Sequence, residues 1–292
     1  MDRVKGRARL TRVLVAVAAF VTLTALYLLV LHIFRVSELP VERRFGALSP
    51  GVAAGEVYLE PVSIDALDDA MRIRAYLAPA PSGSDTVPIA ASRDLTLLVS
   101  HDGTVEQLKL AAGEHQATST FDVDLNDGTV ARYPLDAYTA RVGVRLLEGS
   151  SGQTLPVGVT VWEGALGYEL HTTSQPGPSP EHVHLTTAVR RNGATALFAL
   201  CIYGAMLGLS LSALAVGVLT FTNVCRPEAT LVGALASICF ALPVLRNALP
   251  GSPPHGVDAD MWVFLWSQLV AVACLVLLVF KWAKPGSPST DA

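Results

Sequence analysis

The chain has 292 residues, of which 51% are hydrophobic and 16% are charged, and its formal net charge is −4 at pH 7. This weakly acidic balance excludes the strongly basic surface on which nucleic-acid binding depends, so no nucleic-acid partner is expected. All four cysteines lie in or beside apolar runs, so neither a disulfide framework nor a zinc site is predicted from Cys201, Cys225, Cys239 and Cys274.

The chain opens on a basic tail and a long apolar run. Residues 1–12 carry five basic side chains and one acidic side chain, and Val13–Phe34 holds only His32 as a potential charge. A cleaved signal peptide has an apolar region of about 7–15 residues and a small-residue cleavage site. This run is longer and ends without such a site. Residues 13–34 are therefore predicted to form an uncleaved transmembrane helix, with the tail 1–12 in the cytoplasm.

Residues 36–189 are predicted to form an extracytoplasmic domain built from short strands. Apolar and polar residues alternate over short runs, which is typical of half-buried strands, and turn residues separate the runs. The strands are predicted at 57–64, 71–77, 95–100, 105–110, 121–125, 141–146, 157–161, 168–172 and 182–190. Strands of this number and spacing favour an antiparallel β-sandwich.

The run 122–128, Asp-Val-Asp-Leu-Asn-Asp-Gly, resembles a calcium loop. An EF-hand needs glycine at position six and an acid at position twelve. Here glycine stands at position seven and Tyr133 at position twelve. A hairpin with Asp-Gly at its turn and two exposed acids before it is the favoured interpretation.

His182 and His184 are the second metal-like pattern, because alternate residues of a strand share one face. Exposed histidine pairs are more common than zinc sites, and whether these two bind metal stays open. The sequence has no nucleophile elbow, zincin motif, P-loop or dinucleotide fingerprint. We therefore predict no catalytic residue, no cofactor and no metal.

Three further apolar runs are predicted as transmembrane helices, at residues 195–220, 229–245 and 261–281. A helix needs roughly 20 apolar residues to cross the hydrocarbon core of a bilayer. The second run is short, and Pro243 is expected to distort its last turn. The fold class is thus an α+β membrane protein: four transmembrane helices, one N-terminal and three C-terminal, with the antiparallel β-sandwich between them. Four crossings return the tail 282–292 to the cytoplasm, which defines a multi-pass protein of the cell (inner) membrane.

Small residues form a ridge on the first of these three runs, at Gly204, Gly208 and Ser212. Such ridges allow helix backbones to approach closely. The ridge is interpreted either as a dimerisation face or as a surface that packs against another span of the same chain. The second interpretation is favoured.

The loop 246–260 is the most specific stretch of the membrane block. Its prolines and glycines fix an unusual backbone just outside the bilayer, and Arg246 is expected to pair with Asp258 or Asp260. The loop is interpreted as a rigid cap on two helices, with a docking or ligand loop as the alternative. The other candidate residues in it are Asn247, Pro250, Gly251, Pro253, Pro254 and Gly256.

The stretch LPVLRNALPGSPPHGVDADMWVFLW, together with the run YPLDAY at 133–138, resembles an uncharacterised actinobacterial membrane family, domain of unknown function 4436. The resemblance covers most of the chain and implies one span, an outer domain and three spans. The family has no established activity, so it implies an architecture and no mechanism.

A weaker resemblance is to pentameric ligand-gated channels. In those proteins a β-sandwich ends in a basic pair before the first pore helix, as Arg190 and Arg191 stand here, and the run 133–136 resembles a loop at their membrane edge. This chain departs from them, because it has no loop cysteines, only three spans after the sandwich and one span before it.

Asp136 is predicted to pair with Arg190 or Arg191 and so to couple the outer domain to the membrane block. Pro134 makes the run 133–138 a rigid corner, and Tyr133 and Tyr138 flank the carboxylate. A guanidinium and a carboxylate held at the membrane edge form a strong hydrogen-bonded pair. The alternative is that Asp136 only satisfies backbone N–H groups of its own turn.

The function favoured by the sequence is a non-enzymatic binding or accessory module of the cell envelope. Its expected partners are the lipid bilayer and either an envelope protein or a second copy of the chain. The first alternative is a subunit of a transporter or channel, although no charge lies mid-span to mark an ion path. The second alternative is an envelope enzyme that uses histidines and acids of the outer domain.

Overall fold

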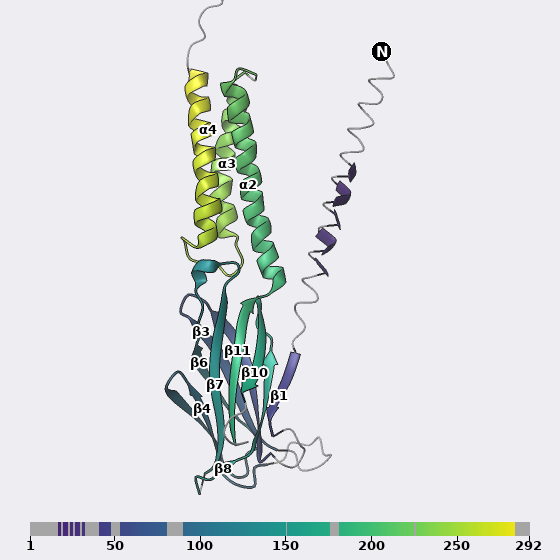
Figure 1. Ribbon diagram of the computed structural model, residues 1–292, viewed down its shortest axis with the longest axis vertical. Helices are drawn as coiled ribbons and strands as arrows, with labels where there is room; N and C mark the ends of the chain where they lie inside the picture. The colour runs from purple at the N-terminus through teal and green to yellow at the C-terminus, as the bar shows by residue number, and fades with distance from the viewer. Residues whose placement is uncertain are drawn as a thin grey trace, which may run out of the picture.

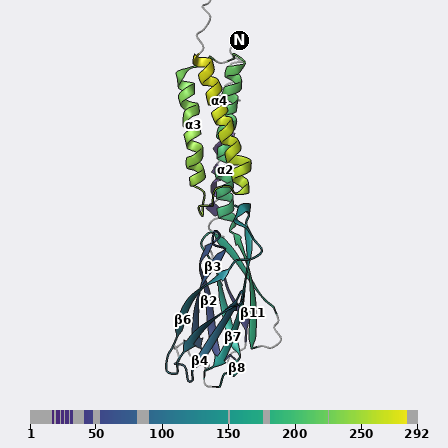
Figure 2. The same ribbon diagram turned by 90° about the vertical axis from the view of Figure 1, so that its left-hand side faces the viewer.

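The computed structural model describes residues 41–47, 53–80, 90–149, 151–175, 181–224 and 226–283, together with twelve residues between 17 and 32. The predicted tail 1–12, much of the predicted span 13–34 and most of the tail 282–292 lie outside these residues. The molecule is elongated, with a β-sheet domain at one end and three long helices at the other (Figures 1 and 2).

Two sheets build the domain from Val41 to Arg191, called the β domain below. The first sheet has the strand order β1-β9-β2-β3-β6. Its strands are β1 (Val41–Gly46), β9 (Val157–Glu163), β2 (Gly55–Asp65), β3 (Ala70–Pro79) and β6 (Ala117–Asp124). The second sheet has the order β10-β11-β7-β4-β5, and the short strand β8 also pairs with β7. Its strands are β10 (Tyr168–Gln175), β11 (His182–Arg191), β7 (Ala137–Glu148), β4 (Leu95–His101), β5 (Thr104–Leu110) and β8 (Thr154–Leu155).

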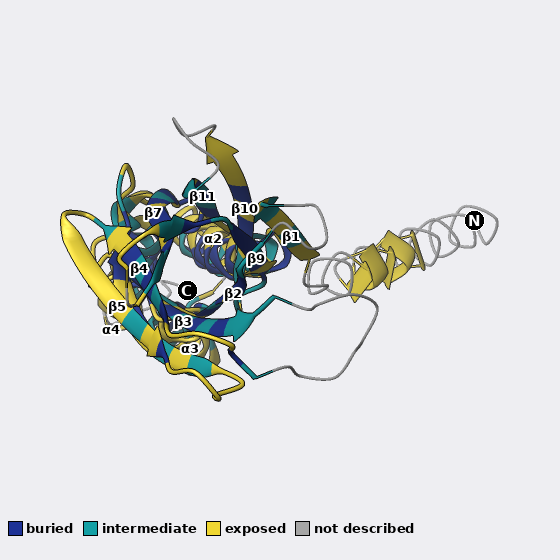
Figure 3. Ribbon diagram, turned by 90° about the horizontal axis from the view of Figure 1, so that it is seen from below, coloured by how far each residue is buried: buried dark blue, intermediate teal, exposed yellow. Residues whose placement is uncertain are grey.

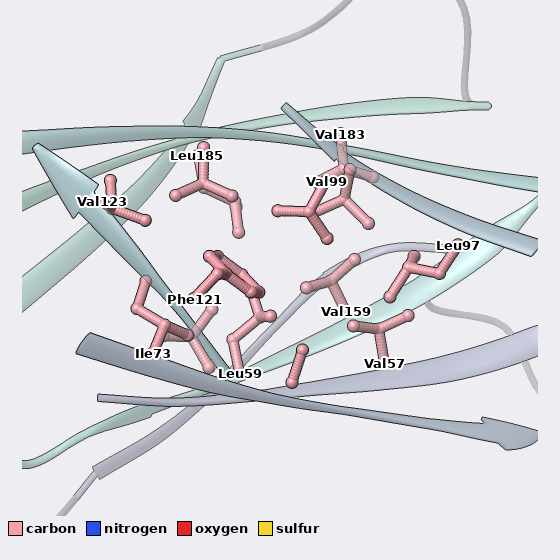
Figure 4. Packing of buried hydrophobic residues seen from close by; sticks show 14 of the residues in the cluster. Val57, Leu59, Ile73, Leu97, Val99, Phe121, Val123, Val159, Val183 and Leu185 are labelled. Carbon is pink, nitrogen blue, oxygen red and sulfur yellow. The ribbon is translucent and has the colours of Figure 1, made fainter. Parts of the chain in front are cut away.

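One apolar core lies between the two sheets. Alternate side chains of the central strands point inward, as the period-two pattern predicted, and form a single buried cluster. Figure 4 shows Val57, Leu59 and Ile73 of the first sheet facing Val99 and Leu185 of the second. The sandwich predicted from the alternation is therefore confirmed.

The sandwich differs from the predicted set of antiparallel strands in two ways. Strand β1 was not predicted, because its sequence VERRFG shows no clear alternation of apolar and polar residues. It lies at the edge of the first sheet, where Arg43 pairs with Glu163 and Arg44 pairs with Glu56. Strand β9 lies between β1 and β2 and pairs with β2 in parallel, so the sandwich is not purely antiparallel.

The Asp-Gly turn at 127–128 does not close a hairpin. Strand β6 belongs to the first sheet and β7 to the second, and the chain between them passes through a short 3-10 helix, η1 (Val130–Arg132). The favoured hairpin interpretation of this run was therefore wrong. Asp122 is exposed on β6, as expected, and pairs with Arg72 of β3, which lowers the pKa of the Asp122 carboxyl.

Three helices long and apolar enough to cross a membrane follow the β domain. They are α2 (Gly193–Phe221), α3 (Ala229–Asn247) and α4 (Leu265–Ala283), and a π-helical turn, η2 (Asp260–Phe264), leads into α4. Helix α2 begins directly after β11, where Asn192 caps it by accepting a hydrogen bond from the N–H of Thr195 at 2.7 Å. Helix α3 continues through Pro243 to Asn247.

Polar contacts fix the register of α2 against α4 at two levels. At one level the hydroxyl of Tyr203 donates to Asp260 at 3.0 Å. At the other, the ammonium of Lys281 donates to the carbonyls of Thr220 and Phe221 at the C-terminal end of α2, where cations are favoured. The seventeen helical steps from Tyr203 to Thr220 span about 26 Å, close to the ~30 Å of a bilayer core.

Candidate functional site: a buried joint between the β domain and the helices

A buried ion pair lies where the β domain meets the helices. The Nε of Arg191 donates to Oδ1 of Asp136 at 2.7 Å, and the two side chains are 3% and 0% exposed. Asp136 stands just before β7, and Arg191 is the last residue of β11, which pairs with β7. The hydroxyl of Tyr138 donates to the second carboxylate oxygen of Asp136 at 3.1 Å. Both oxygens of this buried carboxylate are thus hydrogen-bonded.

Two aromatic rings enclose the guanidinium of Arg191. Its central carbon lies 4.7 Å from the ring centre of Tyr133 and 4.9 Å from that of Tyr168, within the range of cation–π attraction. Burial raises the pKa of Tyr133 to about 12 and also raises the pKa of Tyr138 and of Tyr168. The peptide bond between Tyr133 and Pro134 is cis.

Tyr133 connects this ion pair to the loop between α3 and α4. Its hydroxyl donates to the carbonyl of Pro250 at 2.9 Å, and its side chain is 1% exposed within the apolar cluster of the helices. The next loop residue, Gly251, has φ +75°, and a Cβ there would lie 2.8 Å from Nη1 of Arg191. A residue with a side chain at position 251 would therefore be strained and would press on the guanidinium.

A second buried ion pair closes the loop 246–260. Nη2 of Arg246 donates to Oδ2 of Asp260 at 2.7 Å, with side chains 5% and 4% exposed, and Nε donates to the same oxygen at 3.1 Å. Nη2 also donates to the carbonyl of Pro254 at 2.6 Å, and the N–H of Gly256 donates to Asp260. The other oxygen of Asp260 accepts the hydroxyl of Tyr203. The loop is therefore fastened to all three helices, as a cap requires.

The two ion pairs, the loop 246–260 and the tyrosines that contact them (Tyr133, Tyr138, Tyr168 and Tyr203) are called the joint below. Arg190 and Asp258, the alternative partners considered from the sequence, are exposed and take no part in either pair. Asn247 is also exposed, whereas Pro253 is buried. Tyr168 and Tyr203 belong to the joint but were not predicted from the sequence. A single tyrosine beside a turn or within an apolar run carries no pattern that marks it.

The small ridge of α2 does not pack on the other described helices. Gly204, Gly208 and Ser212 are exposed, and a Cβ at either glycine would meet no atom within 4 Å. The favoured packing of this ridge against another span is therefore wrong for α3 and α4. The close approach is at Gly217 instead, where a Cβ would lie 2.8 Å from Sγ of Cys274 in α4.

A hollow of about 350 Å³ lies on the second sheet, away from the joint. Among its lining residues are Ser100, His101, Arg141, Gly143, Gln175 and His184. His182 does not line it. No group of three or more His, Cys, Asp or Glu side chains suited to a metal ion occurs among the described residues.

These features define a β-sandwich protein joined to three helices that are apolar enough to cross a membrane, through Tyr133 and Arg191 at the end of the β domain and the loop residues Pro250 and Gly251. Residues 49–189 match the family described as Domain of unknown function (DUF4436), and the β domain belongs to that family. Residues 191–285 match a second family, described as Domain of unknown function (DUF8686). No curated protein matches this chain.

The two matches divide the chain at the joint. The resemblance seen in the sequence covered most of the chain, but the match to family 4436 ends at residue 189, and the loop 246–260 falls in the second match. Asp136 and Tyr133 lie in the first matched region, and their partners Arg191 and Pro250 lie in the second. The joint is thus an interface between two separately defined units.

Proposed function

We propose that this protein is a four-span component of the cell membrane that presents its β domain at the outer surface as a non-enzymatic binding or accessory module. Both termini lie in the cytoplasm in this proposal, and the run 13–34 is the fourth span. The joint is the observation that carries it. In it, Tyr133 of the β domain is bonded to Pro250 of the loop and Arg191 lies against Gly251, so the β domain is held in one orientation on the helices.

A fixed orientation is useful to a module that must meet a partner at a set height and angle. It has no evident use in a domain that is only tethered, for which a flexible linker is enough. The polar hollow on the second sheet offers a place for a bound group, through the side chains of Ser100, Arg141 and Gln175. The partner in this proposal is an envelope component or a second copy of the chain.

The charges of the described helices favour a scaffold over an ion path. Within α2, α3, η2 and α4 the charged side chains are Arg246, Asp260 and Lys281, and all three lie near helix ends. Transporters and channels place ionisable groups along the path of the ion. The described residues of these helices carry no charged side chain between the level of Tyr203 and the level of Thr220.

Photo-crosslinking in intact cells tests the proposal. A photoreactive residue at Gln175 or Thr186, beside the hollow, should yield a defined adduct with an envelope component. The same residue at exposed Thr118, on the opposite sheet, serves as the control. The variant Asp136→Asn should lower the adduct yield because it loosens the joint. Ion flux in liposomes without any adduct would overturn the proposal in favour of a channel.

The topology is tested separately. In a background without the four native cysteines, Thr104→Cys on the exposed β4–β5 turn should react with an impermeant thiol reagent in whole cells. Thr222→Cys, exposed just after α2, should react only after the membrane is opened. The reverse pattern would contradict the orientation.

A further inference from the structure

Strand β1 brings the N-terminal part of the chain to the start of α2. Val41 of β1 pairs with Glu163, the last residue of β9. The turn after β9 reaches Gly167, whose carbonyl accepts the N–H of Asn192, the cap of α2. The first residue of β1 and the first residue of α2 therefore lie at the same end of the β domain.

The side of α2 that faces β1 is not the side covered by the other helices. Seen from below, α3 and α4 lie to one side of α2 and β1 lies to the other (Figure 3). Figure 1 shows the same arrangement, with α4 and β1 on opposite sides of α2.

Ion pairs from Arg43 and Arg44 fasten β1 in this place. Only six residues, 35–40, separate β1 from the apolar run that ends at Phe34, so the run ends within about 25 Å of Val41.

The uncovered face of α2 is long enough to receive a second helix. Leu207, Leu211 and Leu214 are 37%, 63% and 41% exposed on it. Its centre is a shallow strip without large side chains, and each member is exposed: Cys201, Gly204, Ala205, Gly208, Ser212 and Ala215. Van der Waals packing drives helix association in lipid, and it gains most where backbones approach closely.

We propose that the apolar run Val13–Phe34 packs antiparallel against this face of α2 and completes a four-helix bundle. The inference rests on the proposed four-span topology and adds the place of the fourth span. The six-residue connection holds this run near α2 at a high effective concentration, which favours it over a second copy of the chain. The described part of this run stands apart from α2 in Figure 1, and its residues Ala18, Thr22 and Ala25 are helical and exposed. Their spacing puts three small side chains on one face, which is free for the proposed contact.

The lengths of the two helices set the register. The run leaves the cytoplasm as residue numbers rise, and α2 returns to it, so the helices are antiparallel. Phe34 ends the uncharged N-terminal run, and Tyr203 marks the outer level at which α2 bonds to Asp260. With about 1.5 Å per residue in each helix, levelling Phe34 with Tyr203 puts Ala25 beside Ser212 and Thr22 beside Ala215.

Disulfide cross-linking of the full-length protein in its native membrane tests the packing. The four native cysteines are replaced, and Ala25→Cys is combined with Ser212→Cys, or Thr22→Cys with Ala215→Cys. A disulfide forms where Cα atoms lie about 4.4–6.8 Å apart. Tyr27→Cys with Ser212→Cys is the control, because Tyr27 is two positions from Ala25 and points away from it on a helix.

The expected result is an intramolecular disulfide in most of the monomer for at least one of the two face pairs, and a several-fold lower yield for the Tyr27 control. Equal yields in face and control pairs, or no disulfide in either face pair, would overturn the proposal. A disulfide-linked dimer from Ser212→Cys alone would overturn it in favour of a second copy on this face. If thiol labelling shows the proposed topology and the face pairs fail, only this packing is wrong. If Thr222→Cys is labelled in whole cells and Thr104→Cys is not, the four-span topology itself is contradicted.

Discussion

Arg191 donates a hydrogen bond to Asp136 at 2.7 Å across the boundary between the regions that match the two families. Arg191 ends the last strand of the β domain, and α2 begins two residues later. Both charges are almost fully buried, and each is the principal neutralising partner of the other. A buried charge that loses its partner keeps its desolvation cost, and Arg191 also lies against Tyr133 and Gly251, so the contact between the β domain and the loop of the helices depends on this bond.

The first prediction follows from that dependence. Asp136→Arg leaves two guanidinium groups in one buried site and should lower the free energy of unfolding by more than about 3 kcal/mol. The double variant Asp136→Arg with Arg191→Asp restores opposite charges and should recover part of the loss. Thermal unfolding in detergent, followed by circular dichroism, measures both.

Arg190 is the matched control for the charge swap. It is adjacent to Arg191, exposed, and outside both buried ion pairs. Asp136→Arg combined with Arg190→Asp should therefore show only the loss of the single variant. Equal recovery by the two double variants would mean that long-range charge, and not this bond, governs the effect.

The second prediction separates Asp260 from Asp258 in the loop. Asp260→Asn removes the buried charge that Arg246 contacts at 2.7 Å, and it should destabilise the protein by about 3–5 kcal/mol. Asp258→Asn changes an exposed residue two positions away and should stay within about 0.5 kcal/mol of the unaltered protein. Thermal unfolding in detergent measures both variants. Equal losses would show that the loop needs its total charge rather than this ion pair.

The sequence could predict the sandwich because burial between two sheets imposes period two on every central strand. The same period decides between the two arginines. Val183, Leu185 and Val189 of β11 are buried, so Arg191 lies on their side of the strand and Arg190 on the other. Applied to the end of the strand, the alternation would have selected Arg191. Strand β1 had no such signal, because an edge strand held by Arg43 and Arg44 buries little apolar surface.

The packing of the helices was harder to predict for a physical reason. A ridge such as Gly204 and Gly208 shows that a close approach is allowed, but it does not say which helix makes the approach. The contact between α2 and α4 uses a single glycine, Gly217, against Cys274. An isolated glycine in an apolar run forms no repeating pattern, so only the structure identifies it.

The third prediction concerns alkaline pH. Burial raises the pKa of Tyr133 to about 12 from its ordinary value of 10.0, so the folded protein favours the neutral phenol. The stability that Tyr133 contributes is therefore fully present below about pH 10 and is lost as the pH rises from 10 towards 12. The hydrogen bond to Pro250 is expected to be lost with the proton.

The absorbance of tyrosinate during an alkaline titration checks the raised pKa, and unfolding measurements over the same pH range check the loss of stability. Tyr133→Phe should be less stable near neutral pH, by about 0.5–1.5 kcal/mol for the lost hydrogen bond, and should lose less stability between pH 10 and 12. Tyr58→Phe is the control, because Tyr58 is 44% exposed and its hydroxyl donates to Glu56 rather than to the loop of the helices. Parallel stability curves for Tyr133→Phe and the unaltered protein would contradict the assignment.

The last prediction is that Gly217, and not the exposed ridge, sets the distance between α2 and α4. A Cβ at position 217 would lie 2.8 Å from Sγ and 3.2 Å from Cβ of Cys274. Gly217→Ile should therefore force the helices apart and cost about 1–3 kcal/mol, as overpacking of a well-packed core does. It should also weaken the bond from Lys281 to the end of α2, because that bond lies one turn further along the same contact. Gly233→Ile is the matched control, since Gly233 of α3 is exposed and a Cβ there meets no atom within 4 Å. Thermal unfolding in detergent compares the two variants with the unaltered protein. A loss of stability in Gly233→Ile that equals the loss in Gly217→Ile would show that a bulky residue is costly at any helix glycine, and that the contact with Cys274 is not the cause.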